Sequence, residues 1–428
     1  MTISKNIFLK KRILVYGLGK SGISTFKFLK KKADVYLFDD NQNINQKLIN
    51  FNQVLKTKFD RIIISPGIDI LNCKLSKFLK KNFSKIYTDL DVFYSFYDNE
   101  SIAITGTNGK STTAKILYDV LVDQKRDVRL IGNIGNPALS EKEISKKTFF
   151  VIEVSSYQLD YSKIFSSKYA VILNISADHI ERHKSLINYV NAKFKLLDSQ
   201  TSRSFAYVKK NDKQITKKLK KSSYKQKIYK VDTSNIGKTL DQLNNTYFTS
   251  EGNKENLSFV LEITSKLKLD NKKIIKTLNN FKGLKYRQQI IFNNKKLTII
   301  NDSKSTSFAS SENILNNHHD IHWILGGIPK KGDKFKLSKK ECKNFKAFIF
   351  GKYHKEFSKI IGNKIKLKKF KNLKETLNEV FFEIKKQKVK KNIIFFSPAG
   401  ASFDSFKNFE DRGNYFNQLI KKFINAKR

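Results

Sequence analysis

In Ile102-Ala103-Ile104-Thr105-Gly106-Thr107-Asn108-Gly109-Lys110-Ser111-Thr112, an apolar strand runs through a glycine-rich turn into the start of a helix. Glycines let the backbone N–H groups of such a turn point at phosphate oxygens, and the helix N-terminus adds partial positive charge. Lys110 is spaced to reach the terminal phosphates of a nucleotide, and the Ser111 hydroxyl is placed to ligate Mg²⁺. The loop is shorter than the common phosphate-binding loop, which has glycine where Ile104 stands. The stretch predicts a site for a nucleoside triphosphate.

Apolar strands alternate with helical spacings on both sides of this turn, which favours parallel sheets with ligand-binding groups at the carboxyl ends of their strands. A chain of 428 residues is too long for one ordinary core. We expect an α/β protein with a Rossmann-like domain over 1–95, a central P-loop ATPase-type domain with a mainly parallel sheet over 96–282, and a Rossmann-like domain over 283–428. The predicted strands are Arg12–Tyr16, Val35–Phe38, Arg61–Ile64, Ile102–Thr105, Phe149–Val154, Tyr169–Asn174, Ser204–Val208, Leu297–Asn301, Ile321–Leu325, Lys346–Phe350 and Asn392–Ser397. The predicted helices are Ser24–Lys31, Leu257–Lys268, Ser307–Asn316, Leu373–Lys386 and Phe406–Lys422.

The first segment carries a second glycine-rich turn. Gly17-Leu18-Gly19-Lys20-Ser21-Gly22 fits the pattern GxGxxG, and Asp39 ends the following strand. An acid about 20 residues after such a turn is typical of a dinucleotide-binding fingerprint. Two interpretations stay open: the turn binds a ligand that contains a nucleotide, or its glycines only permit tight packing of helix against strand.

Two motifs of the central segment place metal-binding side chains at the ends of strands. Glu153 begins Glu153-Val154-Ser155-Ser156-Tyr157-Gln158-Leu159, and His179 lies within Asn174-Ile175-Ser176-Ala177-Asp178-His179-Ile180-Glu181-Arg182-His183. A carboxylate beside a phosphate loop suits Mg²⁺, which prefers oxygen ligands. Without that loop, Glu153 would be an ordinary solvated strand end. We expect His183, His318 and His319 to be structural and not to bind metal.

Lysine dominates the charge of the chain. Lys and Arg number 84 against 38 Asp and Glu, which gives a formal net charge of +46. A basic chain can bind nucleic acid or an anionic membrane. The lysines are nevertheless spread along the whole sequence, and Arg, the usual residue for bidentate phosphate and base contacts, is scarce. We interpret the charge as a lysine-biased composition and expect no nucleic-acid partner.

The remaining composition predicts a cytoplasmic protein with no membrane partner. Cys73 and Cys342 form no CxxC or metal-binding spacing, so neither a disulfide framework nor a structural zinc is expected. No stretch approaches the roughly 20 apolar residues of a membrane helix. The apolar run Ile13–Tyr16 is too short for the core of a signal peptide.

Taken in order, these motifs resemble a known family. GTNGKST (106–112), EVSSYQL (153–159) and NISADHIERH (174–183) are similar to the central domain of the Mur ligases, the amide-forming enzymes of peptidoglycan precursor synthesis. GLGKSG (17–22), SPGI (65–68), GNIG (132–135), NDSKST (301–306) and SPAGASFD (397–404) extend the resemblance over essentially the full length. It is greatest to the branch that adds D-glutamate to UDP-N-acetylmuramoyl-L-alanine.

The resemblance implies roles for individual residues. Lys110, His179, Lys193 and Lys304 would be catalytic, and Ser111, Glu153, His179 and Lys193 would hold metal. Lys193 matches the family lysine that is carbamylated, a change that turns a cation into an anion able to bind metal beside phosphate. An ordinary helix-surface lysine is the alternative. The resemblance further assigns Asn256, Arg287 and Asp302, with Gly106–Thr112, to ATP; Gly17, Leu18, Gly19, Lys20, Ser21, Asp39, Ser65, Pro66, Gly67 and Asn133 to the UDP substrate; and Lys304, Thr306, Lys330, Ser402 and Phe409 to D-glutamate. Whether Lys330 or Lys331 faces the glutamate stays open.

The implied reaction uses ATP and two Mg²⁺ ions. ATP would phosphorylate the L-alanyl carboxylate, and the amine of D-glutamate would attack the acyl-phosphate in a monomeric enzyme. Two alternatives stay open. One is another amino-acid ligase of the superfamily, such as one that adds glutamate to a folate, against which the GLGKSG and SPGI stretches argue. The other is a nucleic-acid-binding NTPase, which the net charge would suggest.

Overall fold

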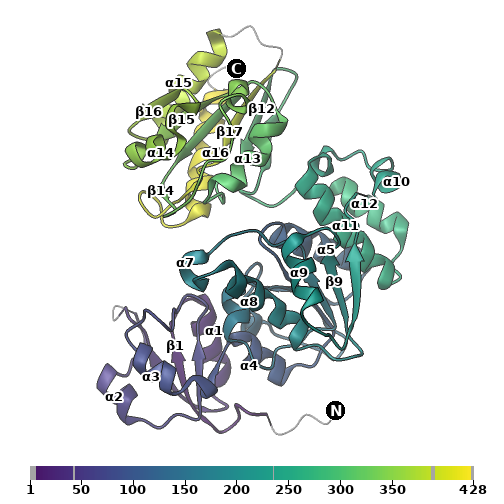
Figure 1. Ribbon diagram of the computed structural model, residues 1–428, viewed down its shortest axis with the longest axis vertical. Helices are drawn as coiled ribbons and strands as arrows, with labels where there is room; N and C mark the ends of the chain where they lie inside the picture. Colours follow the sequence, from purple (N-terminus) through teal and green to yellow (C-terminus); the bar gives the residue numbers. More distant parts are fainter. Residues whose placement is uncertain (1–5, 42–43, 235, 387–390, 426–428) are drawn as a thin grey trace. The chain divides into compact units, whose positions relative to one another are not determined.

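A computed structural model describes residues 6–41, 44–234, 236–386 and 391–425 (Figure 1). The chain divides into two compact units, Met1–Phe281 and Lys282–Arg428. Within the described ranges, each strand predicted from the sequence is present with bounds shifted by two residues at most. The prediction of an α/β protein with mainly parallel sheets is therefore confirmed.

The N-terminal sheet of the first unit has the strand order β2-β1-β3-β4, and its strands are parallel. Helix α1 begins at Lys20, earlier than predicted, because Gly19, within the glycine-rich turn, takes an extended N-cap conformation. The strands are β1 (Arg12–Tyr16), β2 (Asp34–Phe38), β3 (Arg61–Ile64) and β4 (Ile86–Tyr87), and the helices are α1 (Lys20–Leu29), α2 (Phe51–Lys56), α3 (Ser76–Lys81) and α4 (Asp89–Phe96).

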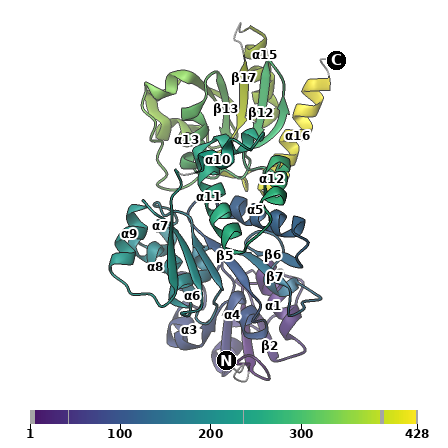
Figure 2. The ribbon, with the colours of Figure 1, turned by 90° about the vertical axis from the view of Figure 1, so that its right-hand side faces the viewer.

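The central sheet of the first unit has the order β10-β9-β8-β5-β7-β6 and is also parallel. Successive side chains of a strand point to opposite faces. Ile102 and Ile104 therefore pack with α5, α11 and α12, whereas Ala103 packs on the face of α6 and α8. Figure 2 shows these helices around the central sheet. The strands are β5 (Ser101–Thr105), β6 (Val128–Gly132), β7 (Phe149–Glu153), β8 (Tyr169–Ile172), β9 (Phe205–Lys209) and β10 (Lys227–Val231). The helices are α5 (Lys110–Asp123), α6 (Ser156–Tyr161), α7 (Ile180–His183), α8 (Leu186–Asp198), α9 (Lys213–Lys220), α10 (Gly237–Leu240), α11 (Glu251–Lys266) and α12 (Asn271–Asn280).

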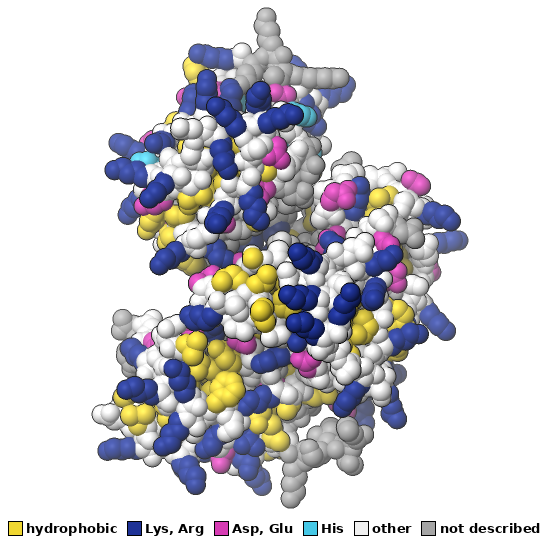
Figure 3. Space-filling view, in the orientation of Figure 1, with side chains coloured by type: hydrophobic (Ala, Val, Ile, Leu, Met, Phe, Trp, Pro, Cys, Tyr) yellow, Lys and Arg dark blue, Asp and Glu magenta, His cyan; other side chains and the backbone are white. Residues whose placement is uncertain are grey.

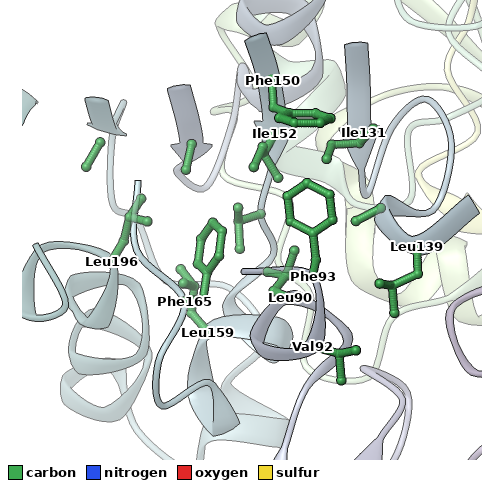
Figure 4. Close-up of a cluster of buried hydrophobic side chains, with 14 of the residues drawn as sticks. Leu90, Val92, Phe93, Ile131, Leu139, Phe150, Ile152, Leu159, Phe165 and Leu196 are labelled. Atoms are coloured by element: carbon green, nitrogen blue, oxygen red, sulfur yellow. The ribbon is translucent and has the colours of Figure 1, made fainter. Parts of the chain in front are cut away.

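The two sheets of the first unit share one hydrophobic core. Leu90 and Phe93 of α4 pack among side chains of the central sheet, and the ring centroids of Phe93 and Phe150 are 4.9 Å apart (Figure 4). The predicted domain boundary between residues 95 and 96 falls at the end of this helix. Helix α4 therefore joins the N-terminal sheet to the central one.

The second unit is built around a sheet with the order β11-β12-β17-β13-β15-β16. Strand β11 is antiparallel to β12, and the other neighbours are parallel. Helices α13 and α14 cover one face, and α15 and α16 cover the other. The elements are β11 (Gln289–Asn293), β12 (Leu297–Asn301), α13 (Phe308–Asn317), β13 (Ile321–Gly326), β14 (Ile328–Pro329), β15 (Phe345–Phe350), α14 (His354–Ile361), β16 (Leu367–Phe370), α15 (Leu373–Lys386), β17 (Asn392–Phe396), β18 (Gly400–Ala401) and α16 (Phe409–Asn425).

Basic side chains are scattered over the surface. Figure 3 shows Lys and Arg across the whole visible face, interspersed with polar and hydrophobic groups. In the part of the chain that the structure describes, none of the helices combines the length and the apolar character needed to cross a bilayer.

Candidate active site

The loop Gly106–Thr112 leaves β5 and opens α5, as the sequence predicts. Gly106 and Gly109 have φ of 155° and 85°, conformations that side chains disfavour. A Cβ on Gly109 would lie 2.0 Å from Asn256 Oδ1, so α11 packs directly against the loop. The Lys110 ammonium donates to the carbonyls of Gly106 and Thr107, both at 2.8 Å. The lysine is thus folded over the loop whose amides would hold phosphate.

Side-chain oxygens that could ligate a metal ion lie close together at the start of α5. The Ser111 hydroxyl donates to Glu153 Oε2 at 2.6 Å, and the Asn133 amide donates to Glu153 Oε1 at 2.8 Å. Glu153 and Ser111 are both buried. Strands β5, β7 and β6 are neighbours in the sheet, which brings these three side chains to one edge. The structure therefore places the predicted metal residues Ser111 and Glu153 together, with Asn133 beside them.

Lys193 of α8 lies beneath the same loop and is not an ordinary surface lysine. Its side chain is buried, and its ammonium donates to Gly106 O at 2.8 Å and lies 4.5 Å from the centroid of the Tyr189 ring. Burial lowers the pKa of Lys193 well below its ordinary value, and the neighbouring Lys110 charge lowers it further. A buried amine with a depressed pKa is the form that can react with CO₂.

His179 lies at the N-cap of α7 with a left-handed φ of 53°. Its Nδ1 is 2.8 Å from the Tyr157 hydroxyl, and its Nε2 is 3.4 Å from Asp178 Oδ2. Burial raises the pKa of Tyr157 to about 12, with Glu181 adding to the shift, so its hydroxyl stays protonated at neutral pH. His183, expected to be structural, is buried with its Nε2 3.0 Å from Ser156 Oγ.

The residues present fit a magnesium nucleotide. Within the described ranges, no group of three or more His, Cys, Asp and Glu side chains is arranged to hold a metal ion by itself. A magnesium ion at Ser111 and Glu153 would therefore complete its shell with phosphate and water oxygens, the arrangement that Mg²⁺ favours in nucleotide sites. A side chain at Gly106 or Gly109 would collide with Leu173 or Asn256, so the loop can keep this conformation only with glycine at both positions.

The N-terminal turn is held by two polar contacts. Leu18 N donates to Asp39 Oδ2 at 2.6 Å, and Ser65 Oγ donates to Gly17 O at 2.5 Å. A Cβ on Gly22 would lie 1.9 Å from Gly17 O. The glycines thus serve the tight packing that one interpretation required, and Asp39 and Ser65 lie at the carboxyl ends of β2 and β3, the two strands that flank β1 and its turn. Of the other predicted UDP-binding residues, Gly19 is the N-cap of α1, Lys20 and Ser21 begin that helix, and Pro66 and Gly67 follow Ser65 in the loop after β3.

The residues assigned to D-glutamate lie on the second unit, together with Arg287 and Asp302, which were assigned to ATP. The Lys304 ammonium is 3.9 Å from the centroid of the Phe409 ring, and Ser402 is buried in the loop that follows β18. Asp302 accepts hydrogen bonds from Gln288 N at 3.1 Å and Ser397 Oγ at 2.9 Å. Burial raises its pKa to about 7. The remaining predicted residues of this unit are Arg287, Thr306 and Lys330.

The structure adds residues that sequence reasoning missed. Asn174 Oδ1 accepts from Asn108 N at 2.9 Å, and the Tyr189 hydroxyl lies 3.2 Å from Thr107 Oγ1, so both brace the phosphate loop. In the second unit the buried Arg412 donates to Ser303 O at 2.7 Å and Gly400 O at 2.9 Å, which ties two loops together. Asn174 lies inside the motif NISADHIERH (174–183), whereas no quoted motif contains Tyr189 or Arg412.

The sequence is similar to those of known proteins. Residues 104–272 match the family described as Mur ligase middle domain. The chain is 31% identical to the UDP-N-acetylmuramoylalanine--D-glutamate ligase of Rickettsia felis, over 97% of this chain and 98% of the relative. It is 33% identical to the protein of that name from Francisella tularensis, over 96% of this chain and 95% of the relative.

Solved structures support the fold. The MurF ligase from Thermotoga maritima, in complex with ADP, has a TM-score of 0.58 and 14% identity, and the match covers 98% of this chain and 97% of that one. UDP-N-acetylmuramate-alanine ligase MurC from the same organism has a TM-score of 0.56 and 17% identity, with 96% and 99% covered. At these identities the likeness concerns the fold alone.

Proposed function

The chain belongs to the Mur ligase family, and from this membership we propose that it is an ATP-dependent ligase that adds D-glutamate to UDP-N-acetylmuramoyl-L-alanine. Full-length relatives at about one-third identity carry that name. The observation that carries the proposal is the convergence of the loop Gly106–Thr112, Glu153 and Lys193 at one edge of the central sheet. The GLGKSG and SPGI loops of the first unit argue against the alternative of a ligase that adds glutamate to a folate.

The phosphate loop would bind and orient ATP. Backbone amides at the N-terminus of α5 would bind the phosphates, and Lys110 can exchange its two loop carbonyls for phosphate oxygens. Mg²⁺, held by Ser111, Glu153 and, for a second ion, His179 and a carbamylated Lys193, would neutralise charge that develops during phosphoryl transfer.

The other residues would position the two remaining substrates. We assign residues 1–95 to the UDP substrate, 96–282 to ATP and 283–428 to D-glutamate. Asn133, bonded to Glu153, would lie beside the muramoyl portion. Lys304, Thr306, Lys330, Ser402 and Phe409 would receive a dicarboxylate, which cationic and hydroxyl groups suit. The acyl-phosphate then reacts with the glutamate amine, the amide bond forms and phosphate leaves, so that no protein nucleophile is needed.

Phosphate release tests the proposal. The protein would be incubated with ATP, Mg²⁺, UDP-N-acetylmuramoyl-L-alanine and either D-glutamate or L-glutamate. We expect release that depends on the UDP substrate and on D-glutamate, and its loss in Lys110→Met. Release of phosphate with nucleic acid in place of the UDP substrate, or equal rates with L-glutamate, would contradict the proposal.

A further inference from the structure

We propose that Arg182 is a positioning residue that couples the substrate loop Ser65–Ile68 to the metal-side residue His179. The inference rests on the proposed function, from which it takes the roles of this loop and of His179. Arg182 and His179 belong to one short element, α7 and its N-cap, while the substrate loop follows β3 of the other sheet. The contacts of Arg182 therefore connect the two sheets of the first unit at the candidate active site.

Helix α7 is a single turn between two strained residues. His179 at its N-cap and Lys184 at its C-cap have φ of 53° and 66°, in the left-handed region that non-glycine residues avoid. Such conformations persist only where the surroundings determine them. Here His183 Nε2 lies 3.0 Å from Ser156 Oγ, and Asn188 Nδ2 donates to His183 O at 2.9 Å. The turn is thus held in place from α6 and α8.

Arg182 extends from this turn to the substrate loop. Its guanidinium donates through Nη2 to the carbonyl of Ile68, a residue 114 positions away in the chain. The guanidinium carbon also lies 5.1 Å from the centroid of the Tyr157 ring and 5.7 Å from that of Tyr161. A guanidinium over aromatic faces is attracted by their negative charge density, and its planar shape is restrained there. Any shift of the substrate loop therefore acts on Arg182 and on the tyrosine rings.

Tyr157 carries the connection to His179. Its hydroxyl lies 2.8 Å from His179 Nδ1, so Nε2 is the nitrogen that would ligate a metal. Histidine ligands depend on the partner of their other ring nitrogen, which sets the tautomer and the orientation of the ring. The contacts run from the Ile68 carbonyl to Arg182, from its guanidinium to the Tyr157 ring, and from the Tyr157 hydroxyl to His179. Loop and histidine thus share one rigid support.

Coupling between the two ligands follows from this support. If the UDP substrate and the magnesium nucleotide each favour the same position of α7, binding of one raises the affinity for the other by an equal factor. Coupling of this kind typically changes affinity by about 5- to 150-fold. Arg182→Met, which removes the bond to Ile68 and the planar cation, should bring that factor close to one.

Calorimetry on the full-length protein tests the inference. The dissociation constant of UDP-N-acetylmuramoyl-L-alanine is measured with and without a non-hydrolysable ATP analogue and Mg²⁺, for the wild type and for Arg182→Met. Lys184→Met is the matched control, because it removes a positive charge from the same turn without a contact to the substrate loop. We expect the wild type and Lys184→Met to show the coupling and Arg182→Met to lack it.

A second variant separates the two ends of the connection. Tyr157→Phe keeps the ring under Arg182 and removes the hydroxyl that contacts His179. We expect it to weaken Mn²⁺ binding in the presence of nucleotide by about 10- to 100-fold, measured by electron paramagnetic resonance, with binding of the UDP substrate alone unchanged. If Arg182→Met fails to fold, Arg182→Lys, which keeps the charge but not the planar group, should show reduced coupling.

These measurements distinguish failure of the proposed function from failure of the role of Arg182. A wild type that binds neither the UDP substrate nor the nucleotide would contradict the proposed function itself. A wild type that binds both without coupling, or an Arg182→Met variant that keeps the coupling, would overturn only the role of Arg182. Mn²⁺ binding of Tyr157→Phe equal to that of the wild type would overturn the connection through the hydroxyl.

Discussion

Substitution of Gly109 by alanine should damage the phosphate loop in a way that can be estimated from its geometry. Gly109 has a φ of 85°, and a Cβ there would lie 2.0 Å from Asn256 Oδ1. The left-handed conformation costs a residue with a Cβ about 1–2 kcal/mol. The clash also displaces Asn256, whose Oδ1 accepts from the Thr113 hydroxyl at 3.3 Å. Loss of that hydrogen bond costs about 0.5–1.5 kcal/mol.

The combined cost is about 1.5–3.5 kcal/mol, which corresponds to a change of about 10- to 300-fold in an equilibrium constant. It can be expressed in two ways. If the loop keeps its conformation, the free energy of unfolding falls by this amount. If the loop relaxes instead, binding of the nucleotide must restore the conformation and the dissociation constant rises. Chemical denaturation and nucleotide titration on the same Gly109→Ala protein would capture both.

Gly19→Ala provides the matched control. Gly19 also lies in a glycine-rich turn before a helix, but its φ is −68° and a Cβ there would meet no atom within 4 Å. We expect this variant to change the free energy of unfolding by less than about 0.5 kcal/mol. The reasoning would be refuted if Gly109→Ala had both the unfolding free energy and the nucleotide affinity of the wild type.

Three further predictions concern buried carboxylates and the buried lysine. Asp91 Oδ1 accepts hydrogen bonds from Ser162 Oγ and three backbone N–H groups, and its Oδ2 accepts one from Thr88 N. In urea denaturation, Asp91→Asn should therefore lower the free energy of unfolding of the first unit by about 2–5 kcal/mol. A loss below about 0.5 kcal/mol would contradict this prediction. Burial raises the pKa of Asp302 to about 7, so the folded state holds its proton more tightly than the unfolded state. The free energy of unfolding of the second unit should therefore fall as pH rises from about 4 to 7. Asp302→Asn should reduce this dependence on pH. Burial lowers the pKa of Lys193, so the unfolded state binds its proton more tightly than the folded state. In CO₂-free buffer the free energy of unfolding should therefore decline as pH falls from about 10.5 toward the lowered pKa. The same decline in Lys193→Met would show that another group is responsible.

Local patterns were enough to locate the buried inner strands of the sheets and the phosphate loop. Buried parallel strands are short continuous apolar runs, so Arg12–Tyr16 and Arg61–Ile64 could be delimited to the residue. The run Gly106–Thr112 combines the positive-φ glycines, the lysine and the hydroxyl that phosphate binding requires, all within one turn of chain. The edge strands β4, β6, β10, β11 and β16 were missed, since many of their side chains are half exposed or exposed and their apolar patterns are weak.

Only the tertiary structure decided which side chains support the site. Sequence alone left Lys193 open between a surface lysine and a functional one, and its burial under Gly106 depends on how α8 packs on the sheet. Asp91 meets the loop that ends at Phe165, and Arg182 meets Ile68, across 74 and 114 residues of chain. Pairings at such separations leave no periodic trace, because they depend on the packing of α4 and α7 between two sheets and not on the local spacing of residues.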